Sequence, residues 1–341
     1  MEAIANENEL EDCLSRPNSQ DIAAAASLGG DVLVLGAGGK MGPSLVARTI
    51  RAIRGAGRNY KVFAAVRQDK LGHLKNLGDG VEVIETDLLD PASYDGLPDA
   101  PNVVFMAGRK FGSTSDQPLT WATNAWMPGL AGHRFRSSRI VAFSTGNIYP
   151  FVDAIDSRGA TEETPAAPVG EYAQSALARE RMFEYCSNRN RTPVLIYRLN
   201  YAIDLRYGVL LDIGQKVFRG EPVDVTMGYV NVIWQGDANS YCLRALPLCS
   251  SPARMLNVTG PEITRVRDIA AQFGALWGKT PVITGSEART ALLSDSSLCT
   301  RLLGPPEVSV PEMIEATGRW IEAGGETLGK PTKFERRDGA F

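Results

Sequence analysis

The feature that most constrains the fold is a set of regularly spaced glycines directly after a short apolar segment. Residues 31–35 are almost continuously apolar, as expected of a strand buried on both faces of a sheet. Glycines then follow at 36, 39 and 42, before a segment in which apolar residues recur at helical spacing. Such a strand-to-helix turn lets the backbone approach a pyrophosphate, whose charge the helix N-terminus favours. The pattern predicts a dinucleotide-binding loop made of Gly36, Gly38, Gly39, Lys40, Met41 and Gly42.

Five more predicted strands follow, and helical patterns separate most of them. Strands alternating with helices in this way indicate a Rossmann-type, doubly wound parallel sheet with right-handed crossovers. Beyond residue 200 the rhythm loosens, and short helices at 267–277 and 311–323 indicate a smaller C-terminal α/β substrate lobe. The further strands are predicted at 61–67, 81–87, 102–107, 139–144 and 194–198.

The same pattern suggests how the chain divides. Residues 1–27 form an extension in which Asn18 to Asp21 cap an alanine-rich helix. The expected divisions are this helical extension (1–27), a dinucleotide-binding domain (28–200, with a return segment at about 231–250), and the substrate lobe (201–230 and 251–341).

Composition and charge narrow the possible chemistry. The chain has 36 Lys and Arg against 39 Asp and Glu, a net charge of −3, which gives no electrostatic footprint for nucleic acid. No apolar run approaches the ~18–20 residues of a membrane span, and the acidic first residues do not resemble a signal peptide, so we expect a cytoplasmic protein. The five cysteines are scattered, and the two histidines, His73 and His133, are expected on the surface or at helix ends. These features disfavour a disulfide framework, a metal site and histidine-based catalysis.

The end of the second predicted strand bears on the choice of cofactor. An acidic residue there favours NAD, because it accepts hydrogen bonds from the adenosine ribose. The strand instead ends in Arg67, which can pair with the 2′-phosphate of NADP, with help from Lys40 in the glycine loop. We therefore favour NADP over NAD, the alternative being that both cations are solvated surface charges. Because ligands bind at the carboxyl ends of strands, further cofactor contacts are expected from Asp87, Leu88, Ala107 and Gly108.

Several motifs follow the glycine loop in a fixed order. They are the acidic segment 85–90, Asn124 in a Trp-Ala-Thr-Asn run, Ser-Thr-Gly-Asn-Ile-Tyr at 144–149, Gly-Glu-Tyr-Ala-Gln-Ser at 170–175, and a closing segment at 294–305. With the loop, they resemble an extended short-chain dehydrogenase/reductase of the NAD-dependent epimerase/dehydratase type, which acts on nucleotide sugars. The resemblance covers about residues 31 to 325, although Leu35 replaces the threonine that usually precedes the first glycine.

The resemblance implies particular site residues and partners. Tyr172 stands at the family's catalytic tyrosine, Thr145 at its catalytic Ser/Thr and Asn124 at its helix asparagine. A sugar or sugar-nucleotide substrate is implied, together with a homodimer through helices near 115–136 and 171–189. The residues considered for substrate contact are Ser144, Asn147, Asn200 and Arg206.

Two positions depart from the family pattern. Ala176, four residues after Tyr172, replaces the lysine that favours the phenolate and holds the nicotinamide ribose. Hydride transfer is therefore expected to be slow unless another cation substitutes. Arg109 and Lys110, after the fourth strand, are better placed by topology than Arg179, which lies two helical turns beyond Tyr172. The second departure follows the sixth strand, where the family's R-x-x-N asparagine falls one position early, at Asn200, and Tyr201 takes its site.

Two functions remain open from the sequence. One is an NAD(P)-dependent oxidoreductase, epimerase or dehydratase that uses Tyr172 as its base. The other is a catalytically impaired NAD(P)-binding sensor or scaffold of the same fold, as an intact glycine loop beside a lysine-free tyrosine helix would predict.

Overall fold

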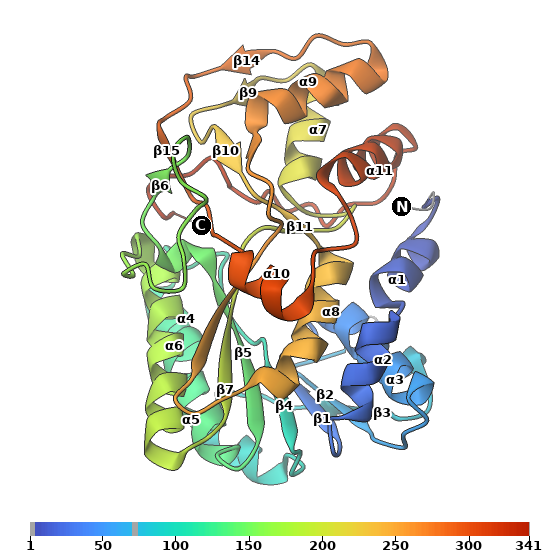
Figure 1. The fold of residues 1–341 in the computed structure, drawn as a ribbon, viewed down its shortest axis with the longest axis vertical. Helices are drawn as coiled ribbons and strands as arrows, with labels where there is room; N and C mark the ends of the chain where they lie inside the picture. The colour runs from blue at the N-terminus through green and yellow to red at the C-terminus, as the bar shows by residue number, and fades with distance from the viewer. Residues whose placement is uncertain (1–3, 70–73, 341) are drawn as a thin grey trace.

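The computed structural model describes residues 4–69 and 74–340 and has a seven-stranded parallel sheet at its centre (Figure 1). The strand order is β12-β7-β5-β4-β1-β2-β3, and each neighbouring pair is parallel. Six of these strands lie within two residues of their predicted bounds, which confirms the Rossmann-type α/β fold. The seven strands are β1 (Val32–Leu35), β2 (Val62–Val66), β3 (Val81–Glu85), β4 (Asn102–Phe105), β5 (Arg139–Thr145), β7 (Val194–Leu199) and β12 (Arg254–Val258).

The order of the strands creates a switch point beside β1. The chain proceeds from β1 to β2 and β3 on one side, then crosses to β4 on the other, so that Leu33 pairs with both Phe63 and Val103. Ligands of open α/β sheets bind at such a point, at the carboxyl ends of the strands. Residues after Leu35 and Phe105 therefore meet at the place where a cofactor is expected.

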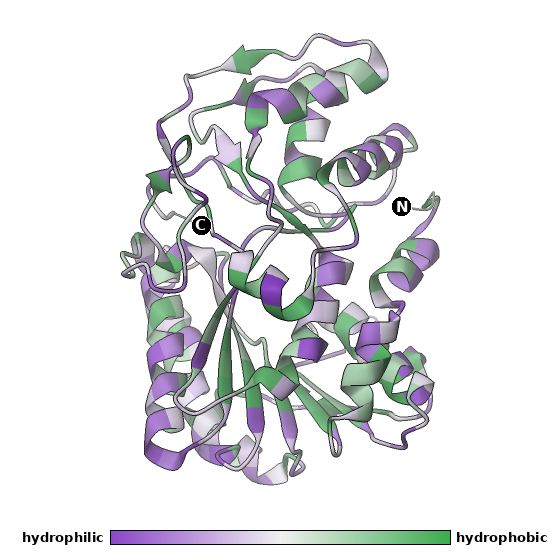
Figure 2. Cartoon of the chain, in the orientation of Figure 1, coloured by the Kyte–Doolittle hydropathy of each residue, from purple (hydrophilic) through white to green (hydrophobic). Residues whose placement is uncertain are grey.

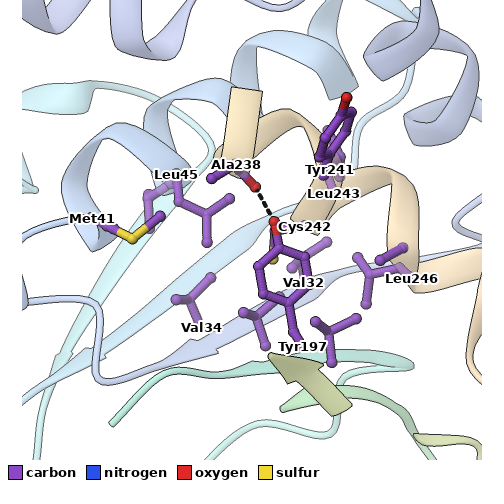
Figure 3. Packing of buried hydrophobic residues seen from close by; sticks show 14 of the residues in the cluster. Val32, Val34, Met41, Leu45, Tyr197, Ala238, Tyr241, Cys242, Leu243 and Leu246 are labelled. Atoms are coloured by element: carbon purple, nitrogen blue, oxygen red, sulfur yellow. Dashed lines mark hydrogen bonds between the residues drawn. The ribbon is translucent and has the colours of Figure 1, made fainter. Parts of the chain in front are cut away.

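Helices cover both faces of the sheet because its strands are apolar on both faces. Val32 and Val34 face α3 (Gly42–Gly55) and α8 (Gln235–Ala245), while Leu33 and Leu35 face α5 (Met127–Arg134) and α6 (Gly170–Asn190). Figure 2 shows the mainly hydrophobic strands beneath helices whose outer sides carry hydrophilic residues. In the α8 layer, the hydroxyl of the fully buried Tyr197 donates to the Ala238 carbonyl at 2.7 Å (Figure 3).

A smaller lobe sits beyond the carboxyl ends of the strands (Figure 1). Its core joins α7 (Val209–Arg219), α9 (Val266–Trp277) and α11 (Val310–Glu322), and the last two match the expected helices to within one residue. Residues 251–341 were expected to belong to the lobe, but β12 within this range is a strand of the central sheet. The remaining short elements are β6 (Val152–Asp153), β8 (Ala202–Ile203), β9 (Val223–Asp224), β10 (Tyr229–Val230), β11 (Ile233–Trp234), β13 (Thr264–Arg265), β14 (Ile283–Thr284), β15 (Thr290–Ala291), α4 (Gln117–Trp121), a π-helical turn (Ala122–Trp126) and α10 (Ser297–Leu303).

The N-terminal extension is docked onto the body rather than projecting from it. It holds α1 (Glu7–Ser15), which the sequence did not reveal, and α2 (Ser19–Ala26), which has the expected cap at Asn18. Asp21 in α2 is fully buried, pairs with Arg48 of α3 at 2.6 Å and accepts a 2.5 Å hydrogen bond from Ser240 of α8. Removing one partner of such a buried pair typically costs about 3–5 kcal/mol, so the extension is part of the folded unit.

Within the described residues, none of the helices combines the length and apolarity that crossing a bilayer requires. All five cysteines are free thiols. In the same part of the chain, no three His, Cys, Asp or Glu side chains gather as metal ligands would.

Candidate active site

Backbone geometry shapes the glycine loop between β1 and α3. Gly36 has φ +88°, and a Cβ there would lie 2.6 Å from the Cα of Ala107, which follows β4. A Cβ on Gly42 would overlap the carbonyl group of Ala37, whereas a Cβ on Gly39 would meet nothing closer than 3.7 Å. Gly36 and Gly42 therefore make the turn possible, while Gly38 and Gly39 leave exposed backbone before α3, where an anion is favoured.

A cavity of about 330 Å³ lies between this loop, the ends of β4, β5 and β7, and the first turns of α6 and α7. A larger hollow of about 700 Å³ lies near Pro101 and Ser138, where β4 and β5 begin. Because ligands of such sheets bind at the carboxyl ends of the strands, the smaller cavity is the candidate site. Among the predicted residues, those lining it are Gly36, Gly39, Lys40, Met41, Gly108, Ser144, Thr145, Asn147, Tyr172 and Asn200.

Tyr172 and Thr145 come to this cavity from different elements. Tyr172 lies in the first turn of α6, and Thr145 ends β5, with its hydroxyl accepting a 3.0 Å hydrogen bond from the Asn147 amide. Asn124 stands behind the wall in the π-helical turn, a feature that often marks functional sites. Its side-chain oxygen accepts a hydrogen bond from the Arg109 N–H and its side-chain nitrogen donates to the Arg109 carbonyl, each at 2.8 Å. The same nitrogen also donates to the hydroxyl of Ser175 in α6.

The missing lysine leaves an apolar position. Ala176 is fully buried in a small cluster with Ile148, Tyr149 and Ala160, and it does not line the cavity. The three cations considered as substitutes, Arg109, Lys110 and Arg179, all line it.

Arg179 reaches the cavity one turn beyond Ala176 and is only 6% exposed. Its guanidinium donates to the Asn124 side-chain oxygen at 2.6 Å and to the Phe143 carbonyl at 2.9 Å. Its long side chain spans the extra turn beyond Ala176, so Arg179 lines the same cavity as Arg109 and Lys110, the cations that topology favoured.

Two lysines give the cavity a positive potential. Lys40 donates to the Ala202 carbonyl at 3.0 Å and lies 4.6 Å from the ring centre of Tyr207. Lys110 donates to the Thr332 carbonyl at 3.3 Å and lies 5.9 Å from the ring centre of Tyr172. Burial lowers the pKa of each lysine to about 8. No aspartate or glutamate among the described residues lines the cavity, so it suits a ligand that carries negative charge.

Other predicted residues lie outside the cavity. Arg67 is exposed after β2, and Lys40 points instead toward Ala202 across the cavity, so the two do not line one site. Asp87 is exposed after β3 and accepts from the Leu89 backbone, and Leu88 is buried in the core. Ala107 does not line the cavity, but its backbone packs closely against Gly36.

The substrate candidates also have structural partners. Arg206 does not line the cavity and instead forms an ion pair with Glu11 of α1 at 2.7 Å. The structure therefore gives Arg206 a contact with α1 in place of the expected substrate contact. The Ser144 hydroxyl donates to the buried Glu180 at 2.5 Å, and the Asn200 amide donates to Asn231 at 3.0 Å. His133 is exposed in the last turn of α5, as expected, and His73 lies outside the described residues.

Some of the cavity wall comes from residues that the sequence did not indicate as site residues. Gly208 precedes α7, and Thr332 belongs to the C-terminal segment, where the side chain of Asp212 accepts its backbone N–H at 2.8 Å. No motif marks these residues, because only the folded lobe brings them to the sheet edge.

A strand–glycine loop–helix unit at the switch point of a parallel sheet defines a dinucleotide-binding protein of the Rossmann class. Residues 32–202 match the model of the NAD-dependent epimerase/dehydratase family, and the chain belongs to that family. A comparison with curated proteins gave no match.

Solved structures with the same fold include three at low sequence identity. They are UDP-glucose 4-epimerase with UDP-glucose from Thermotoga maritima (18% identity, TM-score 0.71, 86% of this chain and 99% of that one), UDP-glucuronic acid 4-epimerase with NAD from Bacillus cereus (19%, 0.70, 86% and 98%), and MoeE5 with UDP-glucose and NAD (20%, 0.68, 86% and 99%).

The described residues fit a nicotinamide dinucleotide. Gly36 and Gly42 form a cradle that a Cβ would fill, and the cavity wall carries cations without acidic side chains. Among the described residues, the buried Nε of Arg179 has no hydrogen-bond partner. A polyhydroxylated, negatively charged ligand supplies the acceptors that this wall requires.

Proposed function

We propose that this protein is an NAD(P)-dependent epimerase, dehydratase or reductase that acts on a sugar or nucleotide sugar. The observation that carries the proposal is a single cavity lined by the glycine loop, Thr145 and Tyr172, with Asn124 fixed directly behind its wall. Of the similar structures, one holds UDP-glucose, one holds NAD and one holds both, which supports this substrate class and cofactor.

Each site residue has a distinct part in the proposed reaction. When bound, the nicotinamide accepts or returns the hydride of a substrate carbinol. Tyr172 takes the hydroxyl proton as the carbonyl forms, a contribution typically worth about 10²–10⁴-fold in rate. Thr145 orients the reacting oxygen, and Asn124 holds the loop after β4 through its two bonds to Arg109. The loop backbone and the start of α3 hold the pyrophosphate.

NADP is the proposed cofactor form. Arg67 is exposed at the end of β2, where an acidic residue would favour NAD, and Asp69 nearby accepts from the backbone of Lys75 at 3.2 Å. A guanidinium at this position suits a 2′-phosphate. Two of the similar structures contain NAD, so the direct test is the ratio of NADPH to NADH affinity.

A second copy of the chain is the proposed partner. Trp121, Trp126 and Tyr185 are 39%, 48% and 58% exposed on α4, the π-helical turn and α6, which pack side by side. Exposed aromatic side chains on adjacent helices are typical of an interface. Sedimentation should give a dimer that Trp126→Arg dissociates, and a wild-type monomer at all concentrations would contradict this.

The alternative function is a dinucleotide sensor or scaffold without turnover. The burial of Ala176 in an apolar cluster favours it, since the lysine position is closed to the cavity. The two functions differ in whether Tyr172 does chemistry.

The experiment screens sugars and nucleotide sugars with purified protein and each cofactor. Cofactor absorbance is followed together with product analysis by mass and NMR, because epimerases regenerate their cofactor. The enzyme predicts turnover that Tyr172→Phe abolishes while cofactor affinity persists. Tight cofactor binding without turnover on any substrate, unaffected by Tyr172→Phe, would establish the sensor instead.

A further inference from the structure

We infer that Arg179 is the ligand-binding cation of this site, replacing the lysine absent at position 176. In this role its guanidinium donates to hydroxyl or anionic oxygens of the bound dinucleotide and holds a positive charge beside Tyr172. This inference rests on the proposed function, because it concerns the same cavity.

The first support is the bonding of the guanidinium itself. Arginine carries five N–H donors, and those of Arg179 reach two neutral oxygens, on Asn124 and Phe143. No carboxylate of the described residues lies within ion-pair distance of it, and its buried Nε lacks an acceptor there. The neighbouring carboxylate, Glu180, is instead paired with Arg198 at 2.8 Å. A buried cation in this state is costly unless a ligand supplies acceptors.

The second support is that the surrounding structure makes room for the guanidinium. Gly108 follows β4, and a Cβ there would clash with Nη2 of Arg179. Asn124 in turn fixes both the Gly108–Arg109 backbone and the guanidinium through one side-chain oxygen. Gly108, Asn124 and Arg179 thus form one arrangement at the cavity wall.

The third support is the relation of Arg179 to Tyr172. The two side chains come from the same face of α6, and both line the cavity. Tyr172, Ala176 and Arg179 stand at i, i+4 and i+7, so the small alanine lies between them. Arginine supplies charge and directed donors but does not exchange protons near neutral pH.

Lys110 then becomes the titratable cation near Tyr172. Its Nζ lies 5.9 Å from the tyrosine ring centre in the same cavity, and burial lowers its pKa to about 8.

The test measures NADPH affinity by fluorescence titration, with folding checked by circular dichroism. Arg179→Met should weaken binding by about 10- to 100-fold, whereas Arg179→Lys should retain binding to within about 10-fold. The matched control is Arg181→Met on the same helix, because Arg181 is exposed and pairs with Glu184. This control should bind like the wild type.

A second variant keeps the inference testable if Arg179→Met does not fold. Gly108→Ala displaces only the end of a flexible side chain, so it should fold and weaken binding by about 5- to 10-fold. Wild-type affinity in folded Arg179→Met, or in folded Gly108→Ala, would overturn the role of Arg179. Neither result would affect the proposed function, which fails separately if the wild type binds no dinucleotide or if Tyr172→Phe retains full turnover.

Discussion

The glycine-loop end of the cavity is made of backbone, whereas the α6 end is made of side chains. At the loop, Gly36 and Gly42 fit because any Cβ would overlap neighbouring main chain. At α6, the cation at the cavity wall comes from Arg179, one turn beyond the position at which the family carries its lysine. A backbone cradle tolerates little change, while a charge can be supplied from any position whose side chain reaches the same point.

The loop end should show the largest effect of a single substitution. Gly42→Ala forces a methyl group onto the Ala37 carbonyl, so we expect a loss of about 3 kcal/mol in unfolding free energy and loss of cofactor binding. Gly39→Ala is the matched control, since its Cβ would make only an ordinary 3.7 Å contact with the Gly36 carbonyl, and it should change stability by less than about 1 kcal/mol. Chemical denaturation measures both, and equal stabilities of the two variants would contradict the backbone account.

A lysine introduced at position 176, where the family carries it, should destabilise the α6 end of the cavity. Ala176→Lys puts an ammonium among Ile148, Tyr149 and Ala160, so we expect a loss of about 2–3 kcal/mol and no gain in turnover. Gln174→Lys, at an exposed position of the same helix, should be neutral. A stable Ala176→Lys protein with faster turnover would show that the lysine site is intact and that Arg179 does not replace it.

Lys40, whose ammonium extends from the glycine loop to the Ala202 carbonyl, links ligand binding to pH. Its pKa falls from 10.5 to about 8 on burial, so the folded protein releases this proton before the unfolded chain does, and stability rises between pH 8 and 10.5. Lys40→Met should stabilise the cofactor-free protein by about 1 kcal/mol at pH 7 and weaken NADPH binding.

The ammonium of Lys40 is lost above its pKa of about 8, so wild-type affinity for NADPH should fall as the pH rises through that value. Thermal melts and titrations from pH 6 to about 10 provide the measurement. A Lys40→Met variant that retains wild-type stability, affinity and pH dependence would exclude this role.

Arg67 should give the smallest effect, because it is exposed after β2 and does not line the cavity. Exposed charge pairs contribute about 0–1 kcal/mol, so Arg67→Ala should lower NADPH affinity by up to about fivefold and leave NADH affinity unchanged. Parallel titrations with the two cofactors distinguish the outcomes. An equal loss for both would mean that Arg67 does not read the 2′-phosphate.

Local sequence patterns were sufficient to predict the sheet and the glycine loop. Except for β3, which carries two glutamates, the strands of the sheet up to β7 are mainly apolar runs, and the cap at Asn18 depends on residues only three positions apart. β12 was missed because it lies beyond residue 200, where strands and helices no longer alternate regularly, although the strand pairs with β7 in the sheet.

The rest of the site depends on long-range packing that one-dimensional patterns do not carry. Thr332 reaches the cavity through Asp212, 120 residues earlier in the chain. Arg206 was expected to contact substrate, but it pairs with Glu11 of α1, a helix that the sequence did not reveal. Helical rise alone did not show that Arg179 lines the cavity, because it ignores the reach of the side chain and the space left by Gly108.

The most direct test of the central claim is calorimetric titration of NADPH and NADH into the wild-type protein and Arg179→Met. If the cavity is a nicotinamide dinucleotide site that depends on Arg179, wild-type protein should bind one dinucleotide per chain and folded Arg179→Met should bind about 10- to 100-fold more weakly. No saturable binding by the wild type, or equal affinity in the two proteins, would contradict the account.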